Sequence, residues 1–400
     1  MKKLIHTPEG VRDIYGSELH SKLWVKQQIS DVFHTFGYED IQTPTFEFFD
    51  VFGSDIGTTP SKELYKFFDK EGNTLVLRPD LTPGVVRAAS KYFVEDEAAI
   101  RLCYEGETYT NTSNLQGKLK EVTQMGVEFI GDGSVYADAE IVHLAVSALK
   151  ASGLKEFTVS VGDVSFFKGI CQEAKLSEET EDELREYISD KNLFGVEEVL
   201  QEKNISKENT DAFLRITELF GSAEVLEEAQ ELVHNDVSRA AIARLKEFYN
   251  LICFYGDEKY VSFDLGLVSR YHYYTGMIFK GYTYGTGDAI LLGGRYDQLV
   301  SYFGKEAPAV GCMVVLDGLL QALASRELLQ SYDQDVTYAV FAKEDTKLAL
   351  QFVNQARALG DRMAVFVLDE KRNEAYYKKL GEKHHAKEVL KIDAKGAKKL

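Results

Sequence analysis

The stretch Gln124-Met125-Gly126-Val127-Glu128-Phe129-Ile130 indicates the fold class of this 400-residue chain. It has the apolar character of a strand, as does Ala99-Ile100-Arg101-Leu102-Cys103-Tyr104, and a longer polar loop separates the two. We therefore predict two antiparallel strands. An amide or a carboxylate in an apolar strand is costly to bury unless it is paired, so Gln124 and Glu128 also mark a candidate polar site.

Helix and strand patterns continue on both sides of this pair. Apolar residues between 18 and 36 recur at helical spacing, and Gly37 ends the predicted helix. The segment Tyr38–Pro44 indicates a strand, and its proline favours an edge or an interface position. Segments 64–68 and 75–78 flank a polar turn and predict a hairpin. Further along we expect a helix at 138–151 and strands at 156–162, 260–265 and 276–282.

Two changes in composition and secondary-structure pattern divide the chain. Residues 166–255 are rich in Glu, Leu and Ala at helical spacing, which indicates a helical insertion. Residues 336–400 alternate between strand and helix patterns, which predicts a small α/β module. The expected fold class is α+β, with an antiparallel sheet flanked by helices. Residues 1–165 and 256–330 form its core, followed by the C-terminal module.

Composition excludes several classes of protein. With 44% apolar residues and 6 prolines, the chain can bury a large core, so disorder is not its main state. No apolar run reaches the roughly 18 residues of a membrane span, and the start lacks a secretory signal, so we expect a cytoplasmic protein with no membrane contact. The net charge of −18 opposes nucleic-acid binding over most of the chain.

Motifs for cofactors and metals are missing. There is no P-loop, and Gly285-Thr286-Gly287 lacks the rest of a dinucleotide fingerprint, so we predict no cofactor. The eight histidines show no zincin pairing, and we predict no metal site. The four cysteines are scattered and are expected to be buried thiols: Cys103, Cys171, Cys253 and Cys312.

Three polar clusters interrupt strand-like segments at 78–82, 124–128 and 293–297. Singly, each has an ordinary explanation: Arg78 with Asp80 as a surface pair, Gln124 with Glu128 on a wet sheet face, and Gly293-Gly294 as a turn. Together they indicate one polar pocket, because buried polar groups need partners.

The clusters also occur in the order and at the distances found in histidyl-tRNA synthetases, a class II family that residues 5–325 resemble. The start Pro8-Glu9-Gly10-Val11-Arg12-Asp13 is similar to the start of those enzymes. Residues 37–44 resemble the motif 1 dimer strand. The other matching segments are Glu63-Leu64-Tyr65, Leu77–Thr82, Gln124–Glu128, Tyr271-His272-Tyr273-Tyr274 and Leu292–Asp297.

The resemblance fails where the synthetases hold ATP. Thr110 and Thr112 stand at the motif 2 Arg and Glu, and Val122 stands at the aromatic residue that stacks on adenine. A further family Arg matches Ser269, and the motif 3 Arg matches Gly318. Adenylate formation needs positioned donors for the leaving pyrophosphate, so we expect this activity to be lost. Lys118 and Lys120 remain in the motif 2 loop, but a lysine does not reproduce a bidentate arginine. Arg270 adjoins the Ser269 position, yet a one-residue slip turns it to the opposite face.

The amino-acid side of the pocket persists. Asp80 and Glu128 are suited to an ammonium and an imidazole N–H, and Gln124 and Thr82 can complete the hydrogen bonds. Tyr274, with Tyr273, can wall the ring. We therefore predict that the pocket binds free histidine without activating it.

A synthetase-like chain of this kind resembles the regulatory subunits of ATP phosphoribosyltransferase. The resemblance implies a non-catalytic partner of the short-form catalytic subunit, a homodimer or higher oligomer, and histidine feedback in histidine biosynthesis. A working histidyl-tRNA synthetase and a sensor of uncharged tRNA remain as alternatives.

Overall fold

The computed structural model describes residues 5–53, 59–93, 99–112, 118–268, 273–330 and 334–400. The chain divides into two compact units, Met1–Leu329 and Gln330–Leu400. Each unit has its own sheet and its own hydrophobic core. Within the described residues, no helix is both long and apolar enough to cross a membrane.

A nine-stranded sheet forms the centre of the first unit. From edge to edge its strands are β1 (Glu39–Asp40), β5 (Ile100–Tyr109), β6 (Glu121–Ile130), β12 (Ala309–Val315), β11 (Leu291–Arg295), β10 (Met277–Tyr282), β7 (Thr158–Asp163), β9 (Val261–Asp264) and β8 (Phe220–Gly221). Neighbours from β5 to β7 are antiparallel, whereas β1 runs parallel to β5 and β9 parallel to β7. The predicted antiparallel sheet is confirmed. The predicted motif 1 strand is only two residues long and lies at the sheet edge.

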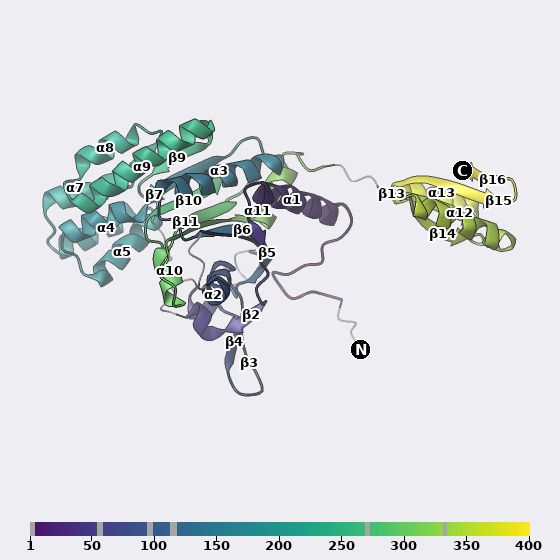
Figure 1. Ribbon diagram of the computed structural model, residues 1–400, viewed down its shortest axis with the longest axis horizontal. Coiled ribbons are helices and arrows are strands. Elements are labelled where there is room, and N and C mark those ends of the chain that lie inside the picture. The colour runs from purple at the N-terminus through teal and green to yellow at the C-terminus, as the bar shows by residue number, and fades with distance from the viewer. Residues whose placement is uncertain (1–4, 54–58, 94–98, 113–117, 269–272, 331–333) are drawn as a thin grey trace. The chain divides into compact units, whose positions relative to one another are not determined.

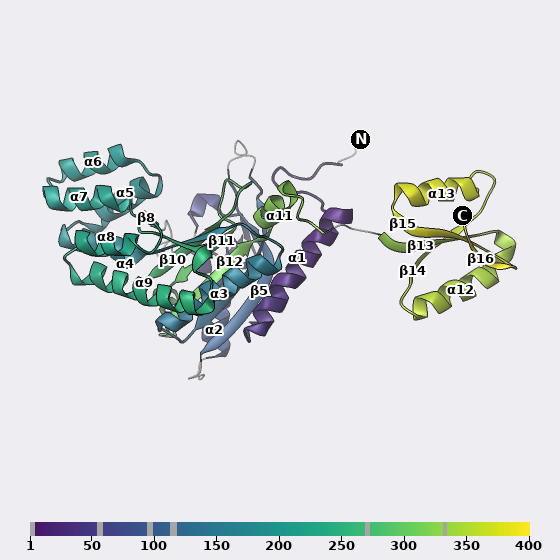
Figure 2. The same cartoon turned by 90° about the horizontal axis from the view of Figure 1, so that it is seen from above.

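Four helices cover one face of this sheet, which we call the helix face. They are α1 (Gly16–Thr35), α3 (Val135–Ala151), α9 (Asp236–Tyr255) and α11 (Leu316–Ser325). In α1, Val25, Ile29 and Phe33 recur every four residues, so they form one stripe that packs into the main core. Figures 1 and 2 show α1, α3 and α9 side by side across the sheet.

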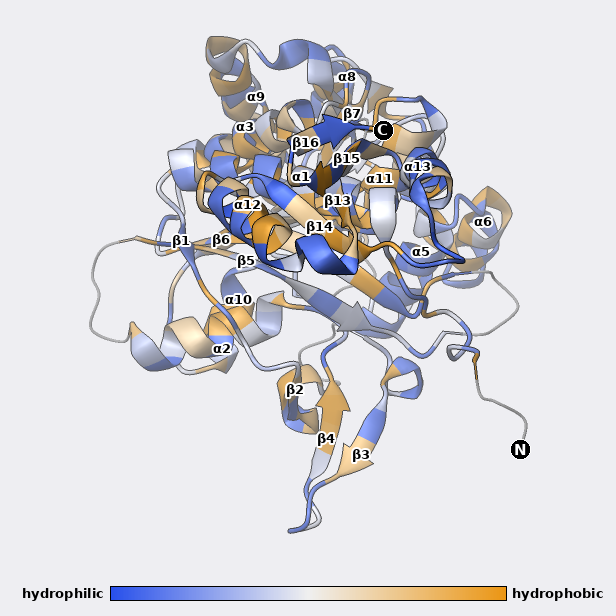
Figure 3. Ribbon diagram, turned by 90° about the vertical axis from the view of Figure 1, so that its right-hand side faces the viewer, coloured by the Kyte–Doolittle hydropathy of each residue, from blue (hydrophilic) through white to orange (hydrophobic). Residues whose placement is uncertain are grey.

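The opposite face, which we call the pocket face, is covered by shorter elements (Figure 1). They are α2 (Thr82–Tyr92), α10 (Asp297–Tyr302), the one-turn helices at Phe49–Phe52 and Ser61–Glu63, and a small sheet of β2 (Phe46–Phe48), β4 (Thr74–Leu77) and β3 (Lys66–Phe68). The predicted hairpin corresponds to β3 and β4. Figure 3 shows the apolar strand β4 in orange and the polar turn at the hairpin tip in blue.

Further helices follow β7: α4 (Val164–Glu173), α5 (Glu178–Ser189), α6 (Leu193–Glu202), α7 (Lys207–Ile216) and α8 (Val225–Leu232), and then α9. The N-caps of α4, α5, α6, α7 and α9 are Asp163, Ser177, Asn192, Ser206 and Asn235, and each side chain accepts a backbone N–H of its first turn. The segment is continuous with the core, because β8 joins the sheet and α4 and α9 share the main cluster. A one-turn helix, Glu258–Tyr260, leads into β9.

Burial of the cysteines differs from the prediction at one position. Cys103, Cys171 and Cys312 are buried thiols, whereas Cys253 is exposed. Cys253 follows Ile252, which packs into the core, and the next residue on a helix is rotated by about 100°, so Cys253 faces outward.

The second unit is a doubly wound α/β module. It contains β13 (Gln334–Phe341), a one-turn helix (Lys343–Asp345), α12 (Thr346–Ala358), β14 (Arg362–Val367), α13 (Glu374–Lys383), β15 (Ala386–Asp393) and β16 (Gly396–Lys399). The order is β14-β13-β15-β16, with the first three strands parallel. Helix α12 packs on one face and α13 on the other. The edge strand β14 is followed by Leu368 and carries no charged side chain after Arg362, while the other edge, β16, carries Lys398 and Lys399.

Candidate functional site

At the centre of the pocket face, three strands carry glycine and therefore present no side chain. Gly126, Gly294 and Gly311 lie on neighbouring strands, and Gly294 and Gly311 are cross-strand partners. A Cβ atom at Gly311 would overlap the Glu128 carboxylate, and one at Gly126 would overlap the Tyr104 hydroxyl. A Cβ at Gly294 would meet the ring of Tyr274, and one at Gly106 would overlap Arg78. The glycines therefore allow larger side chains to lie flat against the sheet.

Glu128 is the most deeply buried acid of this face. It is 1% exposed, and its carboxylate accepts hydrogen bonds from the hydroxyls of Tyr104, at 3.0 Å, and Tyr296. Burial raises the pKa of Glu128 to about 8, although the hydroxyl donors oppose the shift. Glu128 is therefore mainly protonated at pH 7.

Asp80 and Thr82 lie at the start of α2, next to Glu128. Asp80 Oδ1 accepts the Thr82 N–H at 3.1 Å, and Thr82 Oγ1 lies 3.4 Å from the Tyr104 hydroxyl. Burial raises the pKa of Asp80, while the N–H groups of Thr82 and Leu81 lower it. The structure thus brings three predicted residues, Asp80, Thr82 and Glu128, into one hydrogen-bonded group through Tyr104.

Gln124 lies two positions before Gly126 on the same face of β6. It is 7% exposed, and its Oε1 is buried with no hydrogen-bond partner. An unsatisfied buried acceptor costs about 1–3 kcal/mol, so this oxygen is suited to a ligand N–H. The rings of Tyr273 and Tyr274 lie 4.5 Å apart, and that of Tyr273 meets Tyr296 edge-on at 6.1 Å. These aromatic rings therefore adjoin the Glu128 group, because Tyr296 donates to its carboxylate.

The two arginines of the polar clusters lie on different faces of the sheet: Arg78 lies over Gly106 on the pocket face, and Arg295 lies on the helix face. Arg78 donates from Nε to the Glu107 carbonyl at 2.8 Å and from Nη1 to the Thr43 carbonyl at 2.9 Å, so it fastens the chain segment before β2 to β5. Arg295 points to the helix face, where Nε donates to Asp138 at 2.9 Å. Asp138 also accepts from Arg244 of α9. The expectation that the clusters converge holds for their acids, their hydroxyls and Arg78, whose guanidinium is bonded to backbone carbonyls, but not for Arg295.

Beyond Gln124 the pocket face carries three uncharged residues before it reaches Lys120, whose side chain lies against Gly10. Side chains alternate along a strand, so Thr108 and Thr110 share the face of Tyr104, and Val122 shares that of Gln124. Thr112 Oγ1 is buried with no partner. Gly318 lies in the first turn of α11.

Two remaining parts of the motif comparison concern the loops. Lys118 pairs with Asp288 at 3.6 Å, and both side chains are exposed. Ser269, Arg270, Tyr271 and His272 lie outside the described residues, so their predicted places are not part of this geometry.

Sequence reasoning missed Tyr104, Tyr296 and the glycines beneath the acids. Tyr104 ends a predicted strand and Tyr296 lies within a polar cluster, but a tyrosine in a strand is ordinary. The available signal was Gly126 inside an apolar strand, because an interior glycine marks a place where another group approaches the backbone.

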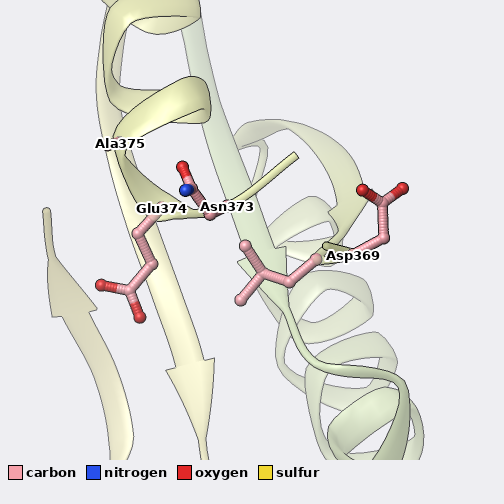
Figure 4. A pocket seen from close by; sticks show the side chains of 5 residues that line it. Asp369, Asn373, Glu374 and Ala375 are labelled. Carbon is pink, nitrogen blue, oxygen red and sulfur yellow. The ribbon is translucent and has the colours of Figure 1, made fainter. Parts of the chain in front are cut away.

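A cavity of about 400 Å³ lies in the C-terminal module. It is lined by Leu368, Asp369, Asn373, Glu374 and Ala375, and Figure 4 shows Asn373 and Glu374 at the start of α13 with Asp369 across from them. Its polar groups have partners: Asp369 accepts two backbone N–H groups of its own turn, Asn373 caps α13, and Glu374 pairs with Lys391 at 2.8 Å. We therefore regard this cavity as structural.

Comparison with known proteins agrees with the fold. The histidyl-tRNA synthetase family model matches residues 10–319, which contain the described pocket. The chain is thus of the histidyl-tRNA synthetase type. An ATP phosphoribosyltransferase regulatory subunit of Ruminiclostridium cellulolyticum is 38% identical over 381 residues, 94% of this chain and 91% of the relative. The chain belongs to the family of ATP phosphoribosyltransferase regulatory subunits.

Solved structures give the same result. A Bacillus halodurans protein described as an ATP phosphoribosyltransferase regulatory subunit/histidyl-tRNA synthetase is 31% identical, with a TM-score of 0.86 over 97% of this chain and 98% of that one. The histidyl-tRNA synthetase of Nostoc sp. PCC 7120 shares the fold, with a TM-score of 0.79 at 19% identity, over 98% of this chain and 92% of that one. Since these matches extend well past Leu329, they include the C-terminal module.

Proposed function

We propose that this chain is a non-catalytic regulatory subunit that acts with a short-form ATP phosphoribosyltransferase catalytic subunit and relays feedback by histidine. The family membership supports the role. The observation that carries the proposal is the pocket face, where acids, hydroxyls and an unsatisfied amide remain together while Thr108, Thr110 and Val122 leave the adjoining positions uncharged.

Histidine offers groups that match this pocket. Asp80 and Glu128 suit its ammonium and an N–H of its imidazole, and a further N–H of histidine can supply the donor that the buried Oε1 of Gln124 lacks. Glu128 holds a proton near neutrality, and a bound ammonium favours release of that proton. A site built from buried polar groups discriminates strongly, because an analogue without the matching donors leaves those groups unpaired.

The same pocket is poorly equipped for adenylation. A leaving pyrophosphate must be held by positioned donors, and loss of one such donor typically costs about 10²–10³ in rate. Thr110 and Gly318 replace two of the family's arginines. Arg78 and Arg295 do not substitute for them, because both guanidinium groups are buried and already bonded to Glu107, Thr43 and Asp138.

Feedback then requires histidine to bind one state of the enzyme complex more tightly than another. A coupling free energy of about 1–3 kcal/mol is typical of such regulation. In this proposal the chain forms a homodimer or a larger oligomer, supplies the histidine site, and contacts the catalytic subunit, which carries the reacting groups.

Reconstitution with a short-form catalytic subunit tests the role. We expect phosphoribosyltransferase activity only when both chains are mixed, and we expect that activity to fall as histidine is added. Phosphoribosyltransferase activity of this chain alone, or a mixture no more active than the catalytic subunit, would refute the proposal.

Titration calorimetry with histidine tests the pocket. We expect E128Q to weaken histidine binding by at least about tenfold, since a charge-assisted hydrogen bond contributes about 1.5–3 kcal/mol. The matched control is E121Q, which removes a carboxylate from the same strand at a position on the helix face. Equal affinities of E128Q and the wild type would exclude this pocket.

Two further assays address the alternatives. Histidine-dependent pyrophosphate exchange would establish a synthetase, and we expect none. Steeply salt-dependent tRNA binding would support a tRNA sensor, and the net charge of −18 argues against it.

A further inference from the structure

A cluster of three potential metal ligands lies at the edge of the large sheet, apart from the residues of the histidine pocket. Within the described residues, His34, Asp40 and Cys103 place one nitrogen, one oxygen and one sulfur atom within 4.8 Å of one another. His34 Nε2 is 3.0 Å from Asp40 Oδ2, and Cys103 Sγ is 3.4 Å from Asp40 Oδ1. Each oxygen of one carboxylate therefore faces a different potential ligand.

Backbone features fix these three residues. His34 lies in the last turn of α1, and Gly37, with φ of +79°, reverses the chain so that β1 begins beside that turn. Asp40 and Cys103 are direct partners in the parallel pairing of β1 with β5, and the Ile41 N–H donates to the Cys103 carbonyl at 2.8 Å. The three side chains thus meet because a helix end and a strand pair position them.

The chemistry of the set points to zinc. Imidazole, thiolate and carboxylate are the three zinc ligand types in proteins, whereas magnesium and calcium take oxygen ligands. Atoms bound to one tetrahedral zinc ion at about 2.0–2.3 Å lie roughly 3.3–3.8 Å from each other. One donor atom from each of the three residues lies within 4.8 Å of the other two here. The side chains of His34 and Asp40 are 45% and 76% exposed, so they can move closer to that range.

We propose that His34, Asp40 and Cys103 form a zinc site with three protein ligands and a fourth position open to water or to a donor from another molecule. Two hydrogen-bond contacts hold the cluster together without metal, one from the imidazole and one from the thiol to Asp40. Zinc binding converts the Cys103 thiol into a thiolate and releases its proton to the buffer. The imidazole binds through Nε2 in its neutral form.

Burial of the Cys103 thiol affects the affinity of this site for zinc. The thiol of Cys103 is buried, and burial together with its hydrogen bond to Asp40 raises its pKa to about 12. Removal of that proton costs free energy, which lowers the net affinity for zinc. One thiolate with an exposed imidazole and carboxylate makes a weaker site than the cysteine-rich sites of zinc fingers.

Cobalt(II) titration of the full-length, tag-free, metal-free chain tests the site, because a thiolate ligand gives a near-ultraviolet charge-transfer band. We expect this band and the visible bands of tetrahedral cobalt to saturate at one equivalent, and zinc to abolish both. C103S should lose the charge-transfer band. H34Q and D40N should each weaken cobalt binding by at least about tenfold, in line with the loss of a ligand.

Controls separate this cluster from other cysteines and histidines. C253S removes the exposed cysteine of α9, and H384Q/H385Q removes the adjacent histidines of the C-terminal module; both variants should titrate like the wild type. Absence of the band in the wild type, or an unchanged band in C103S, would overturn the proposal. If C103S fails to fold, H34Q and D40N decide the question, because both change exposed side chains.

Discussion

The carboxylate of Glu128 lies directly against the backbone of Gly311, its partner on the neighbouring strand. Any side chain at residue 311 would occupy the space of that carboxylate. The missing side chain of Gly311 therefore leaves the space in which the Glu128 carboxylate lies. Because Tyr104 and Tyr296 donate to that carboxylate, the position of the whole hydrogen-bonded group depends on this glycine.

A methyl group at residue 311 should displace Glu128. We expect G311A to lower the free energy of unfolding by about 1–3 kcal/mol, as overpacking does, and to weaken histidine binding at least about tenfold. Urea unfolding followed by fluorescence of Trp24 checks the first value, because this single tryptophan packs against the main core. Calorimetry checks the second.

The matched control is G318A, in α11, where an added Cβ would find its nearest neighbour at an ordinary 3.5 Å. We expect it to be neutral or to stabilise by up to about 1 kcal/mol, since alanine favours a helix over glycine. Wild-type stability and histidine binding in G311A would contradict the close packing of Glu128 on residue 311.

Glu128 should make stability depend on pH. Its pKa is raised from 4.5 to about 8 by burial, so between these values the folded chain holds a proton that the unfolded chain has lost. The stability that this proton contributes is complete below pH 4.5 and is lost as the pH rises to about 8, with a slope of up to about 1.4 kcal/mol per pH unit.

In E128Q the side chain of residue 128 does not titrate in either the folded or the unfolded chain. We expect the free energy of unfolding of the wild type to fall steadily relative to that of E128Q as the pH rises from 5 to 8. Trp24 fluorescence in urea at four pH values measures it, with E121Q alongside. Parallel pH profiles for the wild type and E128Q would mean that residue 128 does not carry a buried proton.

The Asp138 network should be critical for stability. Asp138 is fully buried and accepts hydrogen bonds from Arg295 and Arg244, so it joins α3 to β11 and α9. We expect D138N to cost about 3–5 kcal/mol, because removal of one partner leaves buried positive charge uncompensated. R215Q, which loses only exposed pairs with Glu218 and Glu228, should cost less than about 1 kcal/mol. Similar urea midpoints for D138N and R215Q would argue against a buried network.

The C-terminal module should be dispensable for folding of the core. A chain ending at Leu329 keeps the nine-stranded sheet and its clusters, so we expect its Trp24 unfolding midpoint to match the full-length chain within the error of the measurement. A large fall in that midpoint would show that residues 330–400 stabilise the core.

Much of the fold can be predicted from local patterns. Helix α1 follows from the spacing of Val25, Ile29 and Phe33, and β5 and β6 follow from two apolar runs around a polar loop. The length of β1 does not follow, because only Glu39 and Asp40 meet the ladder of β5.

The site is less predictable, for physical reasons. Arg295 and Tyr296 are adjacent, yet one faces Asp138 and the other Glu128, since neighbouring strand residues point to opposite faces. Sequence alone does not say which face carries the pocket. Likewise, Cys103 is far from His34 and Asp40 in the chain, and only the pairing of β1 with β5 brings the three residues together.

The outer edge of the C-terminal module has a practical consequence. From Met363 to Leu368, the edge strand β14 and the residue after it present six consecutive uncharged residues, with no proline and no glycine. The opposite edge strand, β16, carries Lys398 and Lys399. Short apolar segments of this kind are prone to stack into cross-β fibrils. A fragment comprising residues 330–400 alone is therefore expected to aggregate when concentrated, and a lysine placed at Val365 should keep it dispersed.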